Sequence, residues 1–260
     1  MKLSSLLSSS LAIGLDLLVS SQLSLASPIV VINDNYIGGG ATHSDYTTAD
    51  VIGDNNLFGV SKMEVDLSAG QLSISVFSSY FNNVGQYGTD LGDLFIATTG
   101  WNPVGPAPHL DDTKSTSGTN WTYALVINHN TPAAGQVSDL LGTNGTVSLY
   151  QIPSQSLLVT ANLPGSIYRG DQIVKLDTTG LSPVASGNWS ISDVFGDEFD
   201  KMNINIALSN FSGLQDTIGL RWQMTCANDV IEGAARVPEP LTLGLLSMGL
   251  LGGVIRRGLS

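Results

Sequence analysis

The sequence predicts an all-β fold: a two-sheet antiparallel β-sandwich of jelly-roll type, with one helix at each end of the chain. Three observations predict the sandwich. Apolar and polar residues alternate with period two along the middle of the chain. Glycine and asparagine clusters separate the alternating runs, and no run with helical periodicity exceeds two turns between residues 27 and 236. A closed barrel built from the same strands is the alternative.

The N-terminal segment has the features of a secretory signal peptide. Lys2 precedes a largely apolar stretch in which Asp16 is the one charged residue, and a small-residue site ends at Ala26. We therefore expect residues 1–26 to form a signal helix that is cleaved between Ala26 and Ser27. The remaining chain is then exported across a membrane.

About ten strands are expected in the exported part, residues 27–236. Four of them alternate clearly and should turn one face to the core and one to water: Leu72–Val76, Trp121–Ile127, Met202–Leu208 and Ile218–Met224. Six shorter runs complete the set: Ile29–Ile32, Val60–Leu67, Leu94–Ala97, Val147–Ile152, Leu157–Thr160 and Gln172–Leu176. Ala69-Gly70 and Asn144-Gly145 are each placed to close a hairpin. Residues 191–199 are expected to form one turn or a short helix.

Residues 101–120 predict a long surface loop, because prolines and glycines crowd its first half and few apolar residues follow. Loops held on a rigid scaffold are common places for binding surfaces. Sugar rings stack on exposed aromatic faces while neighbouring carboxylates accept hydrogen bonds from their hydroxyls. Trp101, Asp111 and Asp112 are therefore the candidate ligand-binding residues. Trp121 and Trp222 are in phase with apolar strand faces and are expected in the core.

Composition excludes several functional classes. The chain has 10 Lys and Arg against 22 Asp and Glu, so clustered phosphate contacts and nucleic-acid binding are not expected. Cys226 is the only cysteine, which excludes an internal disulfide, and it is expected to be a buried thiol. The three histidines lack the spacing of a zinc site and are expected in exposed loops. No Gly-x-Ser-x-Gly motif marks a nucleophile.

The C-terminal residues 237–260 combine three parts in a fixed order. Val237-Pro238-Glu239-Pro240 is followed by the uncharged run Leu241–Ile255 and then by Arg256-Arg257. As a helix the run spans ~22 Å, shorter than the ~30 Å hydrocarbon core, but the terminal arginines place its end in the cytoplasm. We expect a short transmembrane helix here, with the preceding domain on the other side of the membrane.

This arrangement resembles the PEP-CTERM sorting signal of exported bacterial proteins. The resemblance implies recognition by an exosortase, a membrane protease-transpeptidase that processes near the Pro-Glu-Pro motif. It also implies a temporary membrane anchor, final placement at the cell surface or outside the cell, and a bacterium that makes extracellular polysaccharide, often in biofilms. The short motifs Asp50–Asp54, Gly92–Ile96 with Gly100–Pro103, and Cys226–Gly233 are similar to uncharacterised exported proteins of this kind.

The sequence therefore predicts an exported surface or matrix protein that has no catalytic activity and binds polysaccharide. One alternative is a secreted glycan hydrolase, which needs two carboxylates about 5–9.5 Å apart. Another is a structural matrix protein stabilised by calcium, with ligands from Asp54-Asn55-Asn56 and from Asp90 to Asp93. No other cofactor or metal is expected. The exported domain carries seven Lys and Arg against 20 Asp and Glu, a net charge of −13.

Overall fold

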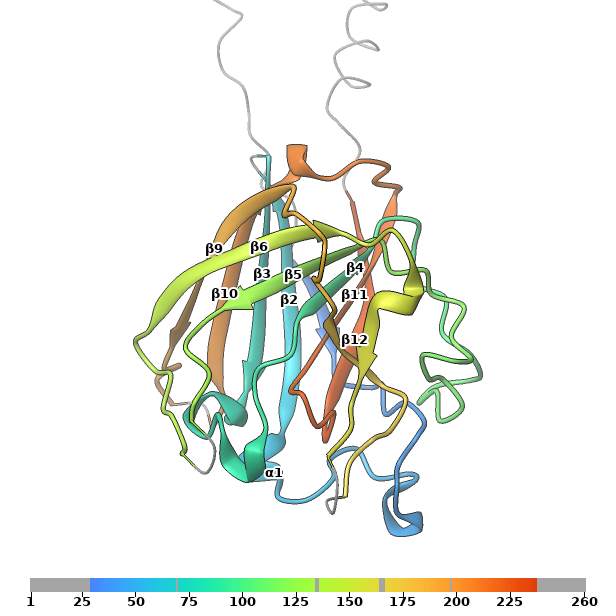
Figure 1. Ribbon diagram of the computed structural model, residues 1–260, viewed down its shortest axis with the longest axis vertical. Coiled ribbons are helices and arrows are strands. Elements are labelled where there is room, and N and C mark those ends of the chain that lie inside the picture. The colour runs from blue at the N-terminus through green and yellow to red at the C-terminus, as the bar shows by residue number, and fades with distance from the viewer. Residues whose placement is uncertain (1–28, 69, 134–135, 164–166, 197, 238–260) are drawn as a thin grey trace, which may run out of the picture.

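The computed structural model describes residues 29–68, 70–133, 136–163, 167–196 and 198–237 (Figure 1). These residues form an all-β structure, as predicted. The strands are β1 Val30–Asn33, β2 Val60–Ser68, β3 Gln71–Ser78, β4 Leu94–Ala97, β5 Tyr123–Asn128, β6 Asn144–Gln151, β7 Leu158–Thr160, β8 Ile173–Leu176, β9 Ala185–Ser192, β10 Asp200–Ala207, β11 Thr217–Gln223 and β12 Val230–Arg236. The helical segments are short: α1 Asn55–Phe58 and the 3₁₀ turns η1 Ser44–Tyr46, η2 Ser79–Asn82, η3 Gln86–Gly88, η4 Gln155–Leu157 and η5 Leu208–Asn210.

One large antiparallel sheet contains ten of these strands, in the order β1-β2-β3-β10-β9-β6-β5-β4-β11-β12. The sheet curls until its two edge strands, β1 and β12, lie side by side. Ile32 of β1 packs against Gly233 of β12, although no hydrogen-bonded ladder joins these edges. We call this contact the seam. The described strands thus form a nearly closed barrel and not the two packed sheets that we predicted.

The core lies inside this barrel and confirms the alternation of three long strands. Leu72, Ile74 and Val76 of β3 point inward, together with Met202, Ile204 and Ile206 of β10 and Ile218, Leu220 and Trp222 of β11. Because side chains alternate across a strand, the residues between them point outward. Cys226 is buried at the edge of this core, as expected, and burial raises the pKa of its thiol to about 12.

A second layer covers part of the outside of the barrel and overturns one expectation. The hairpin β7–β8 and the segments 36–42 and 101–120, which we call the outer layer, lie over β4, β11 and β12. The predicted alternation along Ile218–Met224 places Arg221 on the face toward water, but Arg221 is 2% exposed. Its guanidinium donates hydrogen bonds to Glu232 of β12 and to Gln172 beside β8. Both faces of β11 are therefore buried.

The sequence also misplaced several local features. Asn144 and Gly145 do not close a hairpin, because they pair with Ser190 and Trp189 inside the sheet. Trp121 is buried as predicted, but it packs outside the barrel with Phe95, out of phase with β5. Ile191 belongs to β9, so the expected turn or short helix does not begin there. Gly70, in contrast, does lie in the two-residue connection between β2 and β3.

The predicted terminal features fall largely outside the described residues. The signal helix with its cleavage site at Ala26 and Ser27, the residues Pro238, Glu239 and Pro240, and the Arg256-Arg257 pair all lie beyond them. Val237 is described, and its backbone N–H donates to the Asp216 carbonyl at 2.8 Å. Within the described part of the chain, no helix has the length and apolar character needed to cross a membrane.

Candidate functional site

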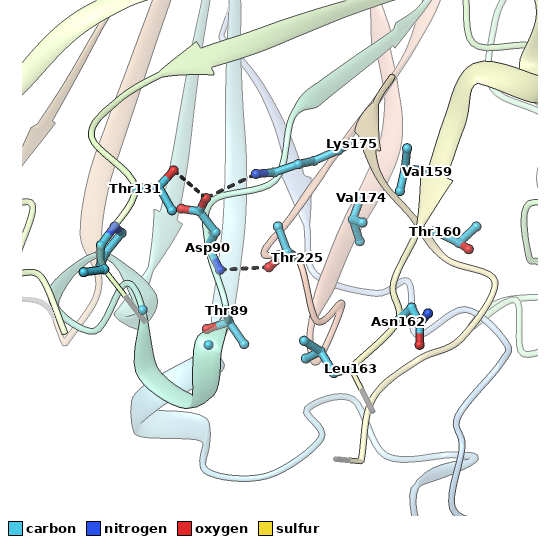
Figure 2. A pocket seen from close by; sticks show the side chains of 14 residues that line it. Thr89, Asp90, Thr131, Val159, Thr160, Asn162, Leu163, Val174, Lys175 and Thr225 are labelled. Carbon is cyan, nitrogen blue, oxygen red and sulfur yellow. Dashed lines mark hydrogen bonds and ion pairs between the residues drawn. The ribbon is translucent and has the colours of Figure 1, made fainter. Parts of the chain in front are cut away.

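A pocket of about 510 Å³ opens between the barrel and the β7–β8 hairpin (Figure 2). Segments far apart in sequence build its walls. Thr89 and Asp90 follow η3, Thr131 to Ala133 follow β5, and Thr225 follows β11. The hairpin supplies the opposite wall: Val159, Thr160, Asn162, Leu163, Val174 and Lys175.

Asp90 organises one wall of the pocket. Its Oδ1 lies 2.9 Å from Nε2 of His129, and its Oδ2 accepts hydrogen bonds from Lys175 Nζ at 3.2 Å and from Thr131 Oγ1 at 3.1 Å. Its backbone N–H donates to Thr225 Oγ1 at 2.8 Å (Figure 2). Contacts on both carboxylate oxygens and on the backbone fix the position of this side chain.

The electrostatics of Asp90 follow from these contacts. Burial opposes ionisation, but the hydrogen bond from His129 and the charge of Lys175 outweigh it and lower the pKa of Asp90 to about 2. The Lys175 side chain remains 41% exposed, so its ammonium group faces both Asp90 and solvent. His129 was expected in an exposed loop, but its side chain is only 6% exposed. This expectation is wrong because the Asp90 carboxylate holds the imidazole against the barrel.

The lining combines hydroxyls, one amide and one ion pair with a few aliphatic side chains. Four threonines and Asn162 offer both donors and acceptors, which are the groups that hydrogen-bond to the hydroxyls of a sugar. Asp90 is the single carboxylate among the described residues of the lining, whereas glycoside hydrolysis uses a pair. Nδ1 of His129 is buried and has no hydrogen-bond partner among the described residues, so no nucleophile hydroxyl engages it.

The three sequence-predicted ligand residues lie elsewhere, in the outer layer. Trp101 is partly buried, donates from Nε1 to Glu232 Oε1 at 2.7 Å, and contacts the ring of His109 edge-on. Asp112 is 1% exposed and accepts a hydrogen bond from Tyr36 Oη at 2.8 Å. Asp111 is exposed. Asp111 is thus exposed to solvent whereas its neighbour Asp112 is buried. Trp101 and Asp112 both make their hydrogen bonds to other residues of the protein.

The residues predicted as calcium ligands do not converge. The Asp54 carboxylate caps α1 by accepting from the Asn56 N–H at 3.0 Å. Asp93 is buried and accepts from the Leu176 N–H at 2.8 Å. Asp90 is held in the pocket wall. Three other carboxylates do meet, at the seam: one oxygen each from Asp34, Asp50 and Asp229 lies within 4.8 Å of the others.

The sequence did not predict the residues that meet around Asp90 or the three carboxylates that meet at the seam, and the reason is the same for both. The sequence marks Asp90 as an expected calcium ligand and Asp50 as the start of a short motif. Nothing local shows that Lys175 and Thr225 approach Asp90, or that Asp34 and Asp229 approach Asp50. The one available signal is position, because Asp34 and Asp229 stand at the ends of apolar runs. Comparison of the chain with family models, with curated proteins and with solved structures gives no match.

Proposed function

We propose that this chain is an exported, exosortase-sorted protein of the bacterial surface or extracellular matrix that binds polysaccharide in the Asp90 pocket without catalysing a reaction. The observation that carries the proposal is the lining of that pocket, in which Thr131, Thr160, Thr225, Asn162 and the Asp90–Lys175 pair surround about 510 Å³. Protein sites for small ligands have volumes of roughly 300–1,000 Å³, so the space suits a few sugar units.

Two features support binding over hydrolysis. The described lining holds one carboxylate, and the low pKa of Asp90 keeps it ionised, whereas a general acid needs a proton near neutral pH. The proposed destination rests on the sequence of residues 237–257, whose order of motif, apolar run and arginine pair resembles the PEP-CTERM signal. The same resemblance implies a bacterium that makes extracellular polysaccharide, so a protein sorted in this way would meet such polymers outside the cell.

The experiment is a glycan array probed with the purified full chain, followed by titration of the glycans that bind. Asn162→Ala removes an exposed amide at the pocket mouth, and Lys175→Gln removes the exposed charge. Each loses hydrogen bonds to the ligand, so we expect the dissociation constant to rise by roughly 5- to 20-fold.

The matched control is Asn205→Ala, which removes an exposed amide from the outer face of β10, away from the pocket lining. Its dissociation constant should stay within about twofold of the unmodified chain. The proposal fails if the unmodified chain binds no glycan, or if Asn205→Ala weakens binding as much as Asn162→Ala.

A further inference from the structure

The acidic cluster at the seam joins the two edges of the sheet. Asp34 directly follows β1 and Asp229 directly precedes β12, the strands whose meeting closes the barrel. Asp50 comes from the segment before α1 and is the exposed member of the three. An ion held here would therefore tie both edge strands to one surface loop.

The carboxylates of the cluster are positioned but incompletely satisfied. Asp229 is fully buried, and its two oxygens accept the backbone N–H groups of Val60 at 2.6 Å and Val230 at 2.8 Å. These bonds aim the carboxylate while leaving a lone pair on each oxygen. Both oxygens of Asp34 are buried and have no hydrogen-bond partner among the described residues. Buried polar atoms are nearly always paired, so a further partner belongs beside Asp34.

Arg169 provides a second and independent observation. Its side chain is 0% exposed, and the Asp229, Asp50 and Asp34 carboxylates all act on its charge. Nη2 donates to the backbone carbonyls of Ala49 and Asp50, whereas Nε and Nη1 are buried without any partner among the described residues. The unpaired acceptors of Asp34 call for a cation or a water, and the unpaired donors of Arg169 call for a water, so the described residues alone leave this cluster incomplete.

The charges of the cluster identify the sign of that ion. Three carboxylates and one guanidinium carry a formal charge of −2, which one divalent cation neutralises. Without a cation the arrangement is unfavourable, since three carboxylate oxygens lie within 4.8 Å of one another and like charges at this distance repel. The donor set contains oxygen only, with no histidine or cysteine, which selects a hard cation over zinc or copper.

We propose that Asp34, Asp50 and Asp229 bind one calcium ion at the seam, with water completing the shell and Arg169 balancing the remaining charge. Calcium accepts six to eight oxygen ligands in flexible geometry, which suits carboxylates from three separate segments better than the strict octahedron of magnesium. Asp50 reaches solvent and provides the entry path. The ion stabilises the closed barrel, and the site is separate from the Asp90 pocket.

The test is calcium titration of the full chain after treatment with chelator, followed by calorimetry and by the melting temperature. Binding to the native state alone raises the melting temperature by mass action. We expect a dissociation constant of about 0.1–1 mM, the range of extracellular calcium modules. Asp50→Asn and Asp34→Asn should each weaken calcium binding roughly tenfold or more, because each removes one charged ligand.

Asp45→Asn is the matched control, since it removes one carboxylate from an exposed turn outside the cluster. Its calcium affinity should stay within about twofold of the unmodified chain. Asp50 is exposed, so its substitution tests the site even where Asp34→Asn fails to fold. If about 10 mM calcium, well above the expected dissociation constant, does not raise the melting temperature of the unmodified chain, the proposal is overturned. The proposal is also overturned if Asp45→Asn weakens calcium binding as much as Asp50→Asn does, or if the unmodified chain binds magnesium as tightly as calcium.

Discussion

Two carboxyl groups three residues apart show how surroundings set the charge of a side chain. Asp90 and Asp93 are both buried. Burial raises the pKa of Asp93 to about 7, since its main compensation is one hydrogen bond from the neutral Leu176 N–H. Asp90 meets His129 and the ammonium of Lys175 instead, and its pKa falls to about 2. The direct contacts of Asp90 with His129 and Lys175 and the deeper burial of Asp93 together separate the two.

The Asp90 contacts predict a loss of stability in acid. The pKa of Asp90 is lower in the folded chain than the ordinary 3.8, so its ionised form stabilises the fold above pH ~4, and this contribution disappears as the pH falls through about 2. The shift of nearly two pH units corresponds to about 2 kcal/mol. In denaturant titrations, the stability difference between the unmodified chain and Asp90→Asn should shrink by that amount between pH 6 and pH 2. Parallel stability curves for the two proteins would contradict the assignment.

At the scale of elements, the seam depends on one glycine. A Cβ atom added to Gly233 of β12 would stand 2.6 Å from Cγ2 of Ile32 but 3.6 Å from its Cβ. Gly233→Ala should therefore push β1 away from β12 and cost about 1–3 kcal/mol in the free energy of unfolding.

A double-mutant cycle isolates this contact. Ile32→Ala removes the clashing carbon, so Gly233→Ala should cost clearly less in the Ile32→Ala background, as measured by urea unfolding. Equal costs in both backgrounds would show that the seam does not close through this pair.

Two strands escaped prediction for opposite reasons. β9 alternates faithfully, but small residues such as Ala185 and Gly187 occupy its inward positions and weaken the apolar signal. β12 shows no alternation, because the barrel core covers one of its faces and the outer layer covers the other. Both strands are identified only from their pairing in the sheet, where β9 lies between β10 and β6, and β12 lies beside β11.

At the scale of the whole molecule, the C-terminal sequence predicts the fate of the chain. In a bacterium that has an exosortase, the unmodified protein should be recovered in processed form outside the inner membrane. Replacing Arg256 and Arg257 by serine removes the positive charges that, in the proposed sorting, hold the end of the apolar run in the cytoplasm. This variant should accumulate unprocessed in the membrane fraction, as followed by immunoblotting of cell fractions.

The control for sorting removes two positive charges from the folded domain instead. The double variant Lys62→Ser and Lys201→Ser changes side chains that lie near the ring of Phe77, on the outside of the barrel. Its processing should match that of the unmodified chain. If both double variants are processed alike, the arginine pair is not part of the signal.

The sequence by itself determined the all-β class and the inward faces of β3, β10 and β11, because period-two alternation is a local consequence of strand geometry. It likewise placed the turn at Gly70, where φ is +76°. These features depend on residues close together in the chain. A sequence pattern reports such features directly.

Only the tertiary structure decided the features that depend on distant residues. The curl of the sheet brings β1 to β12, and with them Asp34 to Asp229. The outer layer buries Arg221 against Glu232. The pocket gathers Asp90, Lys175 and Thr225 from separate segments. Alternation fixes which face of a strand is apolar, but it carries no information about which strand lies beside which, and both proposed sites arise from that order.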